Sequence, residues 1–275
     1  MSTSIAELIT VKMGEMPASE RKAAQTLMAN YPLIGLRTVA DFSAQAGVSS
    51  PTILRFVSRL GFQNYPEFQS ALQEELAAQI QSPLIRNTIM KPPSGAVATL
   101  VASAIENITE TFRHLPEKQV AEVIATLSRP RSRIFLIGGR FTDPIARYMA
   151  AHLRIIRSGV FHIDGQESIW RDQLIDMAKR DVLLVFDIRR YQDSLIRFAE
   201  QAQKRGAEIV LFTDQWISPI SHFSRHVIVG RTAVPSAWDS TTALHLVVET
   251  LIAGLTGQMN QSGERIQLIE RLRNG

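Results

Sequence analysis

The sequence predicts an α/β protein whose N-terminal domain is entirely helical, and two observations support this prediction. Up to about residue 81 the apolar residues follow helical spacing. Beyond residue 130, short unbroken apolar runs alternate with helical segments, which is typical of parallel strands covered on both faces. We therefore expect a helical domain at 1–81, a linker at 82–96, and a doubly wound parallel sheet at 97–275.

The composition is that of a water-soluble globular protein. Of 275 residues, 45% are hydrophobic and 20% are charged. Cysteine is absent, which excludes disulfides, thiolate catalysis and cysteine metal sites, and fits a cytoplasmic location. No apolar run is long enough to cross a bilayer, and residues 1–15 lack the basic start and apolar block of a signal peptide. We expect a cytoplasmic protein without a membrane partner.

The charge balance alone does not indicate a nucleic-acid partner. The net charge is +4, but residues 1–80 hold six Lys/Arg against seven Asp/Glu. The rest of the chain holds 24 against 19. Only a local basic patch in the N-terminal domain can therefore support DNA binding.

The N-terminal domain has clear signals for the beginnings and ends of its helices. Its expected helices span 18–30, 38–46, 50–60 and 65–80. Ser19 and Thr38 are suitable N-caps, and Gly47 suits the left-handed conformation in which a helix often ends. The predicted linker follows, with three prolines and no clear period.

The helix expected at 50–60 has two distinct faces. At 100° per residue, one face is apolar and holds Ile53, Phe56, Val57 and Leu60. The other face is polar and holds Thr52, Arg55, Ser58 and Arg59, with Ser49, Ser50 and Pro51 at the helix start. Because Gly47 allows a sharp turn from the preceding helix, the segment reads as a helix-turn-helix.

Such a motif places the start of its second helix against base edges in the major groove. We expect Ser49, Ser50, Thr52 and Arg55 to read bases, and Ser58 and Arg59 to contact the DNA backbone. The candidate DNA contacts are Thr38, Ser49, Ser50, Pro51, Thr52, Arg55, Ser58 and Arg59. The alternative is an ordinary amphipathic helix with solvated arginines, and the combination of cap, turn glycine and arginine spacing favours binding to double-stranded operator DNA.

The C-terminal domain alternates strands and helices. Strands are expected at 133–138, 159–163, 181–188, 208–214 and 226–230. Helical stripes lie between them, and two further helices are expected at 97–113 and 241–258. The apolar faces of those two helices are broader than one sheet face requires, with Leu244, Val247, Val248, Leu251 and Leu255 as examples. We expect them to join two or four chains into a homodimer or homotetramer.

Residues 38–72, "TVADFSAQAGVSSPTILRFVSRLGFQNYPEFQSAL", resemble the DNA-binding region of the RpiR/MurR family of bacterial transcriptional regulators. The resemblance is carried by Ser49, Thr52, Arg55, Leu60-Gly61-Phe62 and Tyr65-Pro66-Glu67. It implies a C-terminal sugar isomerase (SIS) domain with a flavodoxin-like fold that usually senses phosphosugars. Repression is the commoner outcome in that family.

The two loops that hold phosphate in SIS domains depart from the family pattern. Such loops typically read Gly-x-Gly-x-Ser and Ser-x-Ser-Gly-x-Thr. The first loop here is "GGRFT" (138–142), in which Gly138, Gly139 and Thr142 accompany Arg140. The second is "DIRRYQ" (187–192), with Asp187, Arg189, Arg190 and Gln192 in place of the two serines, the glycine and the threonine. Phosphate recognition by hydroxyls and bare amides therefore cannot be transferred.

These substitutions suggest a different way of holding an anion. Arg140, Arg189 and Arg190 together can grip a small anionic metabolite, either a phosphosugar or a carboxylate. The alternative is a closed site in which Asp187 pairs internally with an arginine. Thr213, Ser218 and the segment 232–240 are further candidates for the rim, although a strand-end turn also explains the first two.

Other chemistry receives little support. His222 and His226 are four residues apart, but no third ligand is evident, and no metal or cofactor is expected. A sugar-phosphate isomerase would need an acid–base pair, for which Glu249 is the one carboxylate that we nominate. The rival interpretations are thus an isomerase-like enzyme and an architectural DNA binder with a non-sensing second domain. We favour a non-enzymatic regulator, most simply a repressor, whose operator affinity depends on the metabolite.

Overall fold

The computed structural model describes residues 4–80, 96–258 and 260–274. It forms two compact units, Met1–Ser82 and Pro83–Gly275. The predicted linker at 82–96 lies outside the described residues except for Ala96, the first residue of a helix. None of the helices in the described ranges combines the length and apolarity needed to cross a membrane.

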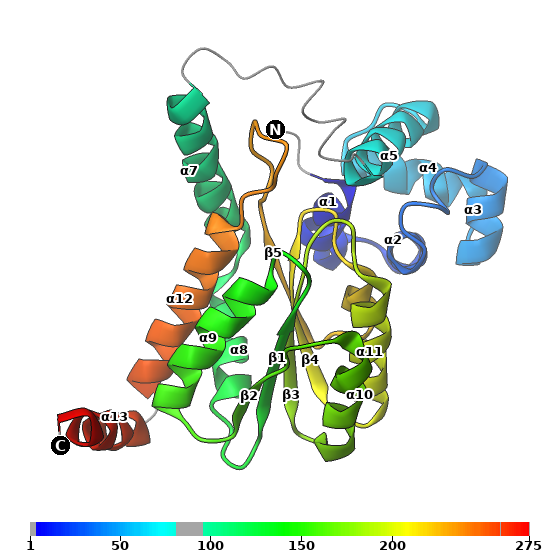
Figure 1. Ribbon diagram of the computed structural model, residues 1–275. Coiled ribbons are helices and arrows are strands. Elements are labelled where there is room, and N and C mark those ends of the chain that lie inside the picture. The colour runs from blue at the N-terminus through cyan, green and yellow to red at the C-terminus, as the bar shows by residue number, and fades with distance from the viewer. Residues whose placement is uncertain (1–3, 81–95, 259, 275) are drawn as a thin grey trace. The chain divides into compact units, whose positions relative to one another are not determined.

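The first unit is built from helices. They are α1 (Ile5–Lys12), α2 (Ala18–Ala29), α3 (Val39–Ala46), α4 (Ser50–Leu60) and α5 (Tyr65–Ile80), with a 3-10 turn at Met13–Glu15 (Figure 1). Its core includes Phe42 and Phe56, whose rings meet edge to face with centroids 6.3 Å apart. The predicted N-cap at Ser19 is wrong: Pro17 is the cap, because its fixed φ lets the helix begin directly at Ala18.

The second unit is a five-stranded parallel sheet of order β2-β1-β3-β4-β5. Its strands are β1 (Ile134–Gly138), β2 (Val160–His162), β3 (Val182–Asp187), β4 (Glu208–Asp214) and β5 (His226–Gly230). Its helices are α7 (Ala96–His114), α8 (Glu117–Leu127), α9 (Asp143–Ile156), α10 (Glu167–Asp176), α11 (Asp193–Lys204), α12 (Thr242–Gln258) and α13 (Asn260–Asn274). This arrangement confirms the predicted fold class.

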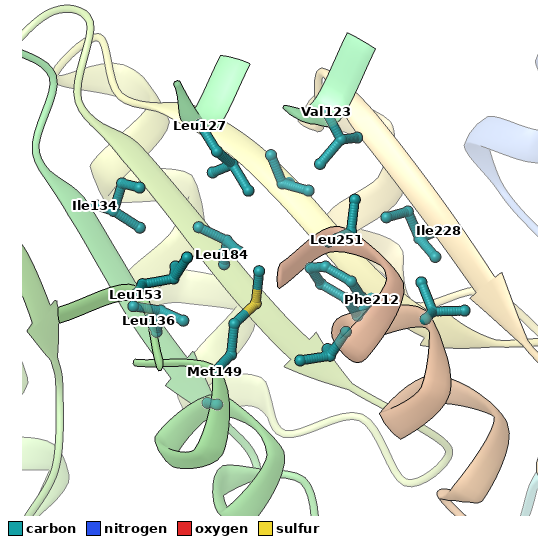
Figure 2. Packing of buried hydrophobic residues seen from close by; sticks show 14 of the residues in the cluster. Val123, Leu127, Ile134, Leu136, Met149, Leu153, Leu184, Phe212, Ile228 and Leu251 are labelled. Carbon is teal, nitrogen blue, oxygen red and sulfur yellow. The ribbon is translucent and has the colours of Figure 1, made fainter. Parts of the chain in front are cut away.

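Helices cover both faces of the sheet (Figure 1). On one face α8, α9 and α12 pack against the strands, and Figure 2 shows Met149 and Leu251 among the buried side chains of that layer. On the other face α10 and α11 bury Trp170, Leu195 and Phe198. Because both faces are covered, the central strands β1 and β3 are buried along their whole length, as their unbroken apolar runs predict.

The strand order fixes where a ligand can enter. β1 lies between β2 and β3, so the connection after β1 leaves toward one side of the sheet and the connection after β3 toward the other. Between these diverging connections the carboxyl ends of the two strands leave a crevice, which is where doubly wound sheets bind ligands. The loops at 139–142 and 187–192 border this crevice.

Candidate functional site: a helix-turn-helix and a crevice at the sheet edge

The turn between α3 and α4 has the geometry that the sequence predicts. The Thr38 side chain caps α3 by accepting a hydrogen bond from the Asp41 amide at 3.1 Å. Gly47 ends α3 with φ of +61°, in the left-handed region where glycine is free of strain. Ser49 is the N-cap position of α4, although its side chain makes no capping bond there. The two helices thus form a helix-turn-helix.

The outer face of α4 differs from the predicted face at one position. Arg55, Ser58 and Arg59 are exposed as expected, but Thr52 is only 4% exposed and faces inward. Thr52 sits in the first turn of α4, where packing against the rest of the bundle covers it. Its predicted place on the outward face, where it would read bases, is therefore wrong.

Thr52 instead positions its neighbours. Its hydroxyl oxygen accepts a hydrogen bond from Arg55 Nη2 at 3.1 Å and lies 2.9 Å from Ser49 Oγ. Ser50 Oγ lies 3.2 Å from Ser43 Oγ of α3, which ties the two helices together. Hydrogen bonds within the unit thus hold the polar residues at the start of α4 in place.

Arg59 has a partner that the sequence did not reveal. Its Nε donates to Glu20 Oε2 at 2.5 Å, and the Glu20 side chain is 4% exposed. This hydrogen bond and the attraction of the carboxylate raise the pKa of the Arg59 guanidinium. The pair connects α4 to α2 across 39 residues of sequence, and helical spacing along one segment cannot predict such a contact.

In the second unit, a pocket of about 270 Å³ occupies the crevice between β1 and β3. It is lined by Gly139, Arg140, Phe141, Thr142, Asp187, Ile188, Arg189, Arg190 and Gln192. Most of the loop residues predicted from the sequence therefore meet in one place. Gly138 lies just beneath them, where an added Cβ would come 2.4 Å from the Asp143 backbone nitrogen, so only glycine fits.

Asp187 forms the floor of this pocket. It is 2% exposed, and its Oδ2 accepts a hydrogen bond from the Ser218 hydroxyl at 2.5 Å. Burial raises the pKa of Asp187 to about 7, with a further contribution from the negative charge of Asp214. A carboxyl group with this pKa changes charge near neutral pH.

Arg189 is turned away from the crevice opening. Its side chain is 6% exposed and pairs with Asp239, while its guanidinium lies 4.2 Å from the centre of the Trp216 ring. Its backbone N–H donates to Asp214 Oδ2 at 2.6 Å. An arginine is thus paired internally, but with Asp239 rather than with Asp187. An ion pair between Asp187 and Arg189 therefore does not close the pocket.

Arg140 and Arg190 remain exposed at the pocket rim. The Arg140 guanidinium lies 5.3 Å from the centre of the Phe141 ring. Arg190 has φ of +63°, an unusual backbone conformation for a residue other than glycine. Two of the three predicted arginines are therefore placed where an incoming anion can meet them.

The hydroxyl groups predicted for the rim are largely structural. Thr142 donates to the Phe186 carbonyl at 2.6 Å and accepts from the Gly139 amide at 2.9 Å. Thr213 and Ser218 are completely buried, and Thr213 Oγ1 accepts from the Ser218 amide at 3.0 Å. The prediction that these two line the mouth of the pocket is wrong, since the turn after β4 encloses them.

The rival sites are not assembled. His222 lies in a 3-10 turn and His226 in β5, so they do not share a helix face, and His226 is buried beside Thr126. Within the described ranges no three His, Cys, Asp or Glu side chains converge as a metal site would require. Glu249 accepts a hydrogen bond from the Tyr148 hydroxyl at 3.2 Å on the outer surface of α9 and α12, away from the crevice residues.

The residues chosen from 241–258 for oligomerisation are buried inside the single chain. Leu244, Val247, Val248, Leu251 and Leu255 are all 0% exposed in the core. The prediction that they join two chains is therefore wrong, because the sheet and the neighbouring helices already cover them. On α7, by contrast, Val97, Leu100, Val101 and Ile105 are between 42% and 79% exposed.

Comparisons with known protein families agree with both units. Residues 3–79 match the rpiR-family helix-turn-helix domain, and residues 126–254 match the SIS domain. The chain therefore combines an rpiR-family helix-turn-helix domain with a SIS domain. It is 27% identical over 218 residues to a protein of Haemophilus influenzae described as an HTH-type transcriptional regulator, covering 77% of this chain and 74% of that one.

Two solved structures share the fold of this chain. The Vibrio vulnificus NanR protein complexed with ManNAc-6P is 18% identical, with 98% of each chain covered and a TM-score of 0.57. The sugar isomerase domain of an RpiR transcription factor from Sphaerobacter thermophilus is 19% identical. That match covers 63% of this chain and 97% of the other, with a TM-score of 0.59. The family predicted from residues 38–72 is confirmed.

Proposed function

We propose that this protein represses transcription by binding operator DNA through α4, and that a small anionic metabolite in the SIS crevice changes its operator affinity. The observation that carries the DNA part is the ordered polar start of α4. Arg55 is exposed there and is steadied by Thr52, so its guanidinium is presented to a groove at low cost in side-chain freedom.

The ligand part is supported by the crevice at the point where the strand order reverses. Arg140 and Arg190 at its rim can form charge-assisted hydrogen bonds with a phosphate or a carboxylate. The NanR structure shares this fold and holds ManNAc-6P, an anionic sugar. Arg140 and Arg190 stand where the family pattern has glycines, and its loop hydroxyls are also replaced, so phosphosugars and carboxylates are both retained as candidate ligands.

We also propose that two chains associate, as this function requires. A two-fold dimer suits a palindromic operator, because each half-site then meets one α4. The stripe of Val97, Leu100, Val101 and Ile105 on α7 provides an apolar surface for a second copy. A ligand then alters operator affinity by binding one arrangement of the dimer more tightly than another.

The test compares the affinity of the protein for genomic fragments selected by binding with its affinity for random duplex DNA. Both affinities are measured with and without candidate anions. We expect selected fragments to be bound at least about a hundredfold more tightly than random duplex, and one anion to shift that ratio. Equal affinity for all DNA under every condition would contradict the proposal. Selective binding that no anion changes would reduce the second domain to an oligomerisation module.

A further inference from the structure

The exposed face of α4 holds a large apolar side chain among polar ones. Leu54 is 47% exposed, whereas the other large apolar residues of this helix, Ile53, Phe56, Val57 and Leu60, are at most 3% exposed. Leu54 also lies outside the apolar core that the described residues 4–80 form. An exposed leucine is common on protein surfaces, so its position on the helix decides whether it has a role.

That position is at the middle of the surface that faces away from the first unit. At about 100° per residue, Leu54 and Arg55 lie on either side of the line that runs along α4 through Pro51 and Ser58. All four residues are exposed, while Thr52 on the opposite side is buried. The burial pattern therefore directs Leu54 and Arg55 outward together, and a groove that receives Arg55 also receives Leu54.

The two side chains suit different features of a base edge. The Arg55 guanidinium, which donates to Thr52 Oγ1 at 3.1 Å, has further donors for guanine O6 and N7. A leucine side chain has no donor or acceptor, and the apolar feature that bases present in the major groove is the C5-methyl group of thymine. Contact between Leu54 and this methyl group removes apolar surface of both from water. Against the polar edge of another base, the same leucine would exclude water from groups that it cannot satisfy.

We infer that Leu54 contacts the methyl group of a thymine and so specifies a T·A pair near the guanine that Arg55 reads. This inference rests on the proposed function of α4 as the DNA-reading helix and adds a residue that determines its sequence preference. Adjacent Cα atoms are about 3.8 Å apart, and successive base pairs are about 3.4 Å apart along the duplex. The thymine therefore lies within about two base pairs of that guanine.

Replacing thymine by uracil isolates the methyl group, because uracil keeps the pairing and the O4 acceptor and lacks only that group. The full-length protein is titrated with an operator selected by binding, and with versions in which each thymine in turn is replaced by uracil. The loss of discrimination in Arg55→Ala locates the guanine. At one thymine within about two base pairs of it, wild-type affinity should fall about fourfold, the effect of burying one carbon group of that size.

Variants of Leu54 show whether this residue makes the contact. Leu54→Ala should bind the operator and its uracil version equally, because the methyl group then has no partner. Alanine favours the helix, and Leu54 is not part of the core, so the unit should stay folded. Leu54→Met keeps a long apolar side chain and should retain most of the sensitivity to uracil. Leu33→Ala is the matched control, because Leu33 is 63% exposed between α2 and α3, and it should respond to uracil as the wild type does.

The outcomes separate this inference from the proposed function. If Arg55→Ala loses its preference for one guanine but uracil weakens Leu54→Ala as much as the wild type, the inference is wrong and α4 still reads DNA. The inference is also wrong if no thymine near that guanine responds to uracil. If the protein binds no fragment more tightly than random duplex, the proposed function is contradicted and the inference is lost with it.

Discussion

Among single residues, Asp187 most clearly separates this crevice from a phosphate loop. It lies at the end of β3, is almost completely buried, and has a pKa raised to about 7 because water is excluded. Asp214, one strand further along the sheet, is also buried, and its pKa is raised to about 6. Two buried carboxyl groups at the ends of β3 and β4 make the stability of this unit sensitive to pH.

The direction of that sensitivity follows from the pKa values. Between about pH 4 and pH 7, folded Asp187 holds a proton that the unfolded chain has released. The free energy of unfolding should therefore fall as pH rises through this window, by up to about 1.4 kcal/mol per pH unit for each such group. Asp214 contributes with the same sign up to about pH 6.

Asp187→Asn should flatten the curve, most visibly between pH 6 and pH 7. The measurement is urea unfolding at a series of pH values, followed by tryptophan fluorescence. All three tryptophans lie in the second unit, so the signal reports that unit alone. A variant with the same slope as the wild type would show that Asp187 is already ionised at low pH.

At the level of helices and strands, patterns in the sequence predict some features of the structure but not others. The unbroken apolar runs predicted all five strands, and the periodicity predicted α3 and α4, because burial on two faces or one face is written into the residue order. The partners of charged side chains could not be predicted. Glu20 and Arg59 are far apart in sequence, as are Arg189 and Asp239, and only the packing of different elements brings them together.

Thr52 illustrates the same limit on a single helix. Its angular position on the helical wheel places it near the polar face, but the neighbouring turn and helices decide what is covered. The prediction that the leucines and valines of α12 join two chains was wrong for the converse reason. A broad apolar face indicates burial, but it does not say whether the covering surface belongs to the same chain or to a second one.

The turn between α3 and α4 depends on one glycine, and this dependence can be tested. Gly47 has φ of +61°, and an added Cβ would contact no other atom within 4 Å, so the cost of alanine there comes from the backbone alone. Gly47→Ala should lower the stability of the first unit by about 1 kcal/mol. Gly14→Ala is the matched control, because that position also has open space but no positive φ.

Calorimetric unfolding of both variants provides the comparison. We expect Gly47→Ala to lose stability and Gly14→Ala to change little. Equal stability of the two would mean that the end of α3 does not depend on the left-handed residue.

The ion pair between Glu20 of α2 and Arg59 of α4 can be tested in the same way. Arg59→Ala leaves the buried Glu20 carboxylate without its partner, so it should lower the melting temperature, and adding Glu20→Gln should restore most of the loss. If Arg59 also contacts phosphate, the single variant will weaken all DNA evenly and reduce the salt dependence of binding. A melting temperature unchanged by Arg59→Ala would show that the ion pair is not needed to hold α4.

For the whole molecule, the proposed association of two chains is tested at the exposed apolar stripe on α7. Ile105→Asp places a charge in that stripe, where Ile105 is 59% exposed. We expect it to shift sedimentation toward the monomer and to weaken binding to a palindromic operator. Ile175→Asp is a matched control on α10, where the isoleucine is 73% exposed and lies outside the stripe. Dimers that persist in Ile105→Asp would exclude α7 as the contact between chains.

We propose that α4 reads DNA sequence, and a variant of Arg55 tests this proposal. Affinity for a selected operator, for single-base variants of it and for random duplex is measured by fluorescence anisotropy over a range of salt concentrations. Arg55→Ala should lose about 1–3 kcal/mol of discrimination at one base position, as expected for a lost arginine–guanine contact. Lys22→Ala, which removes one exposed charge from α2, should leave that discrimination intact. If Arg55→Ala ranks the operators exactly as the wild type does, α4 is not the helix that reads the groove.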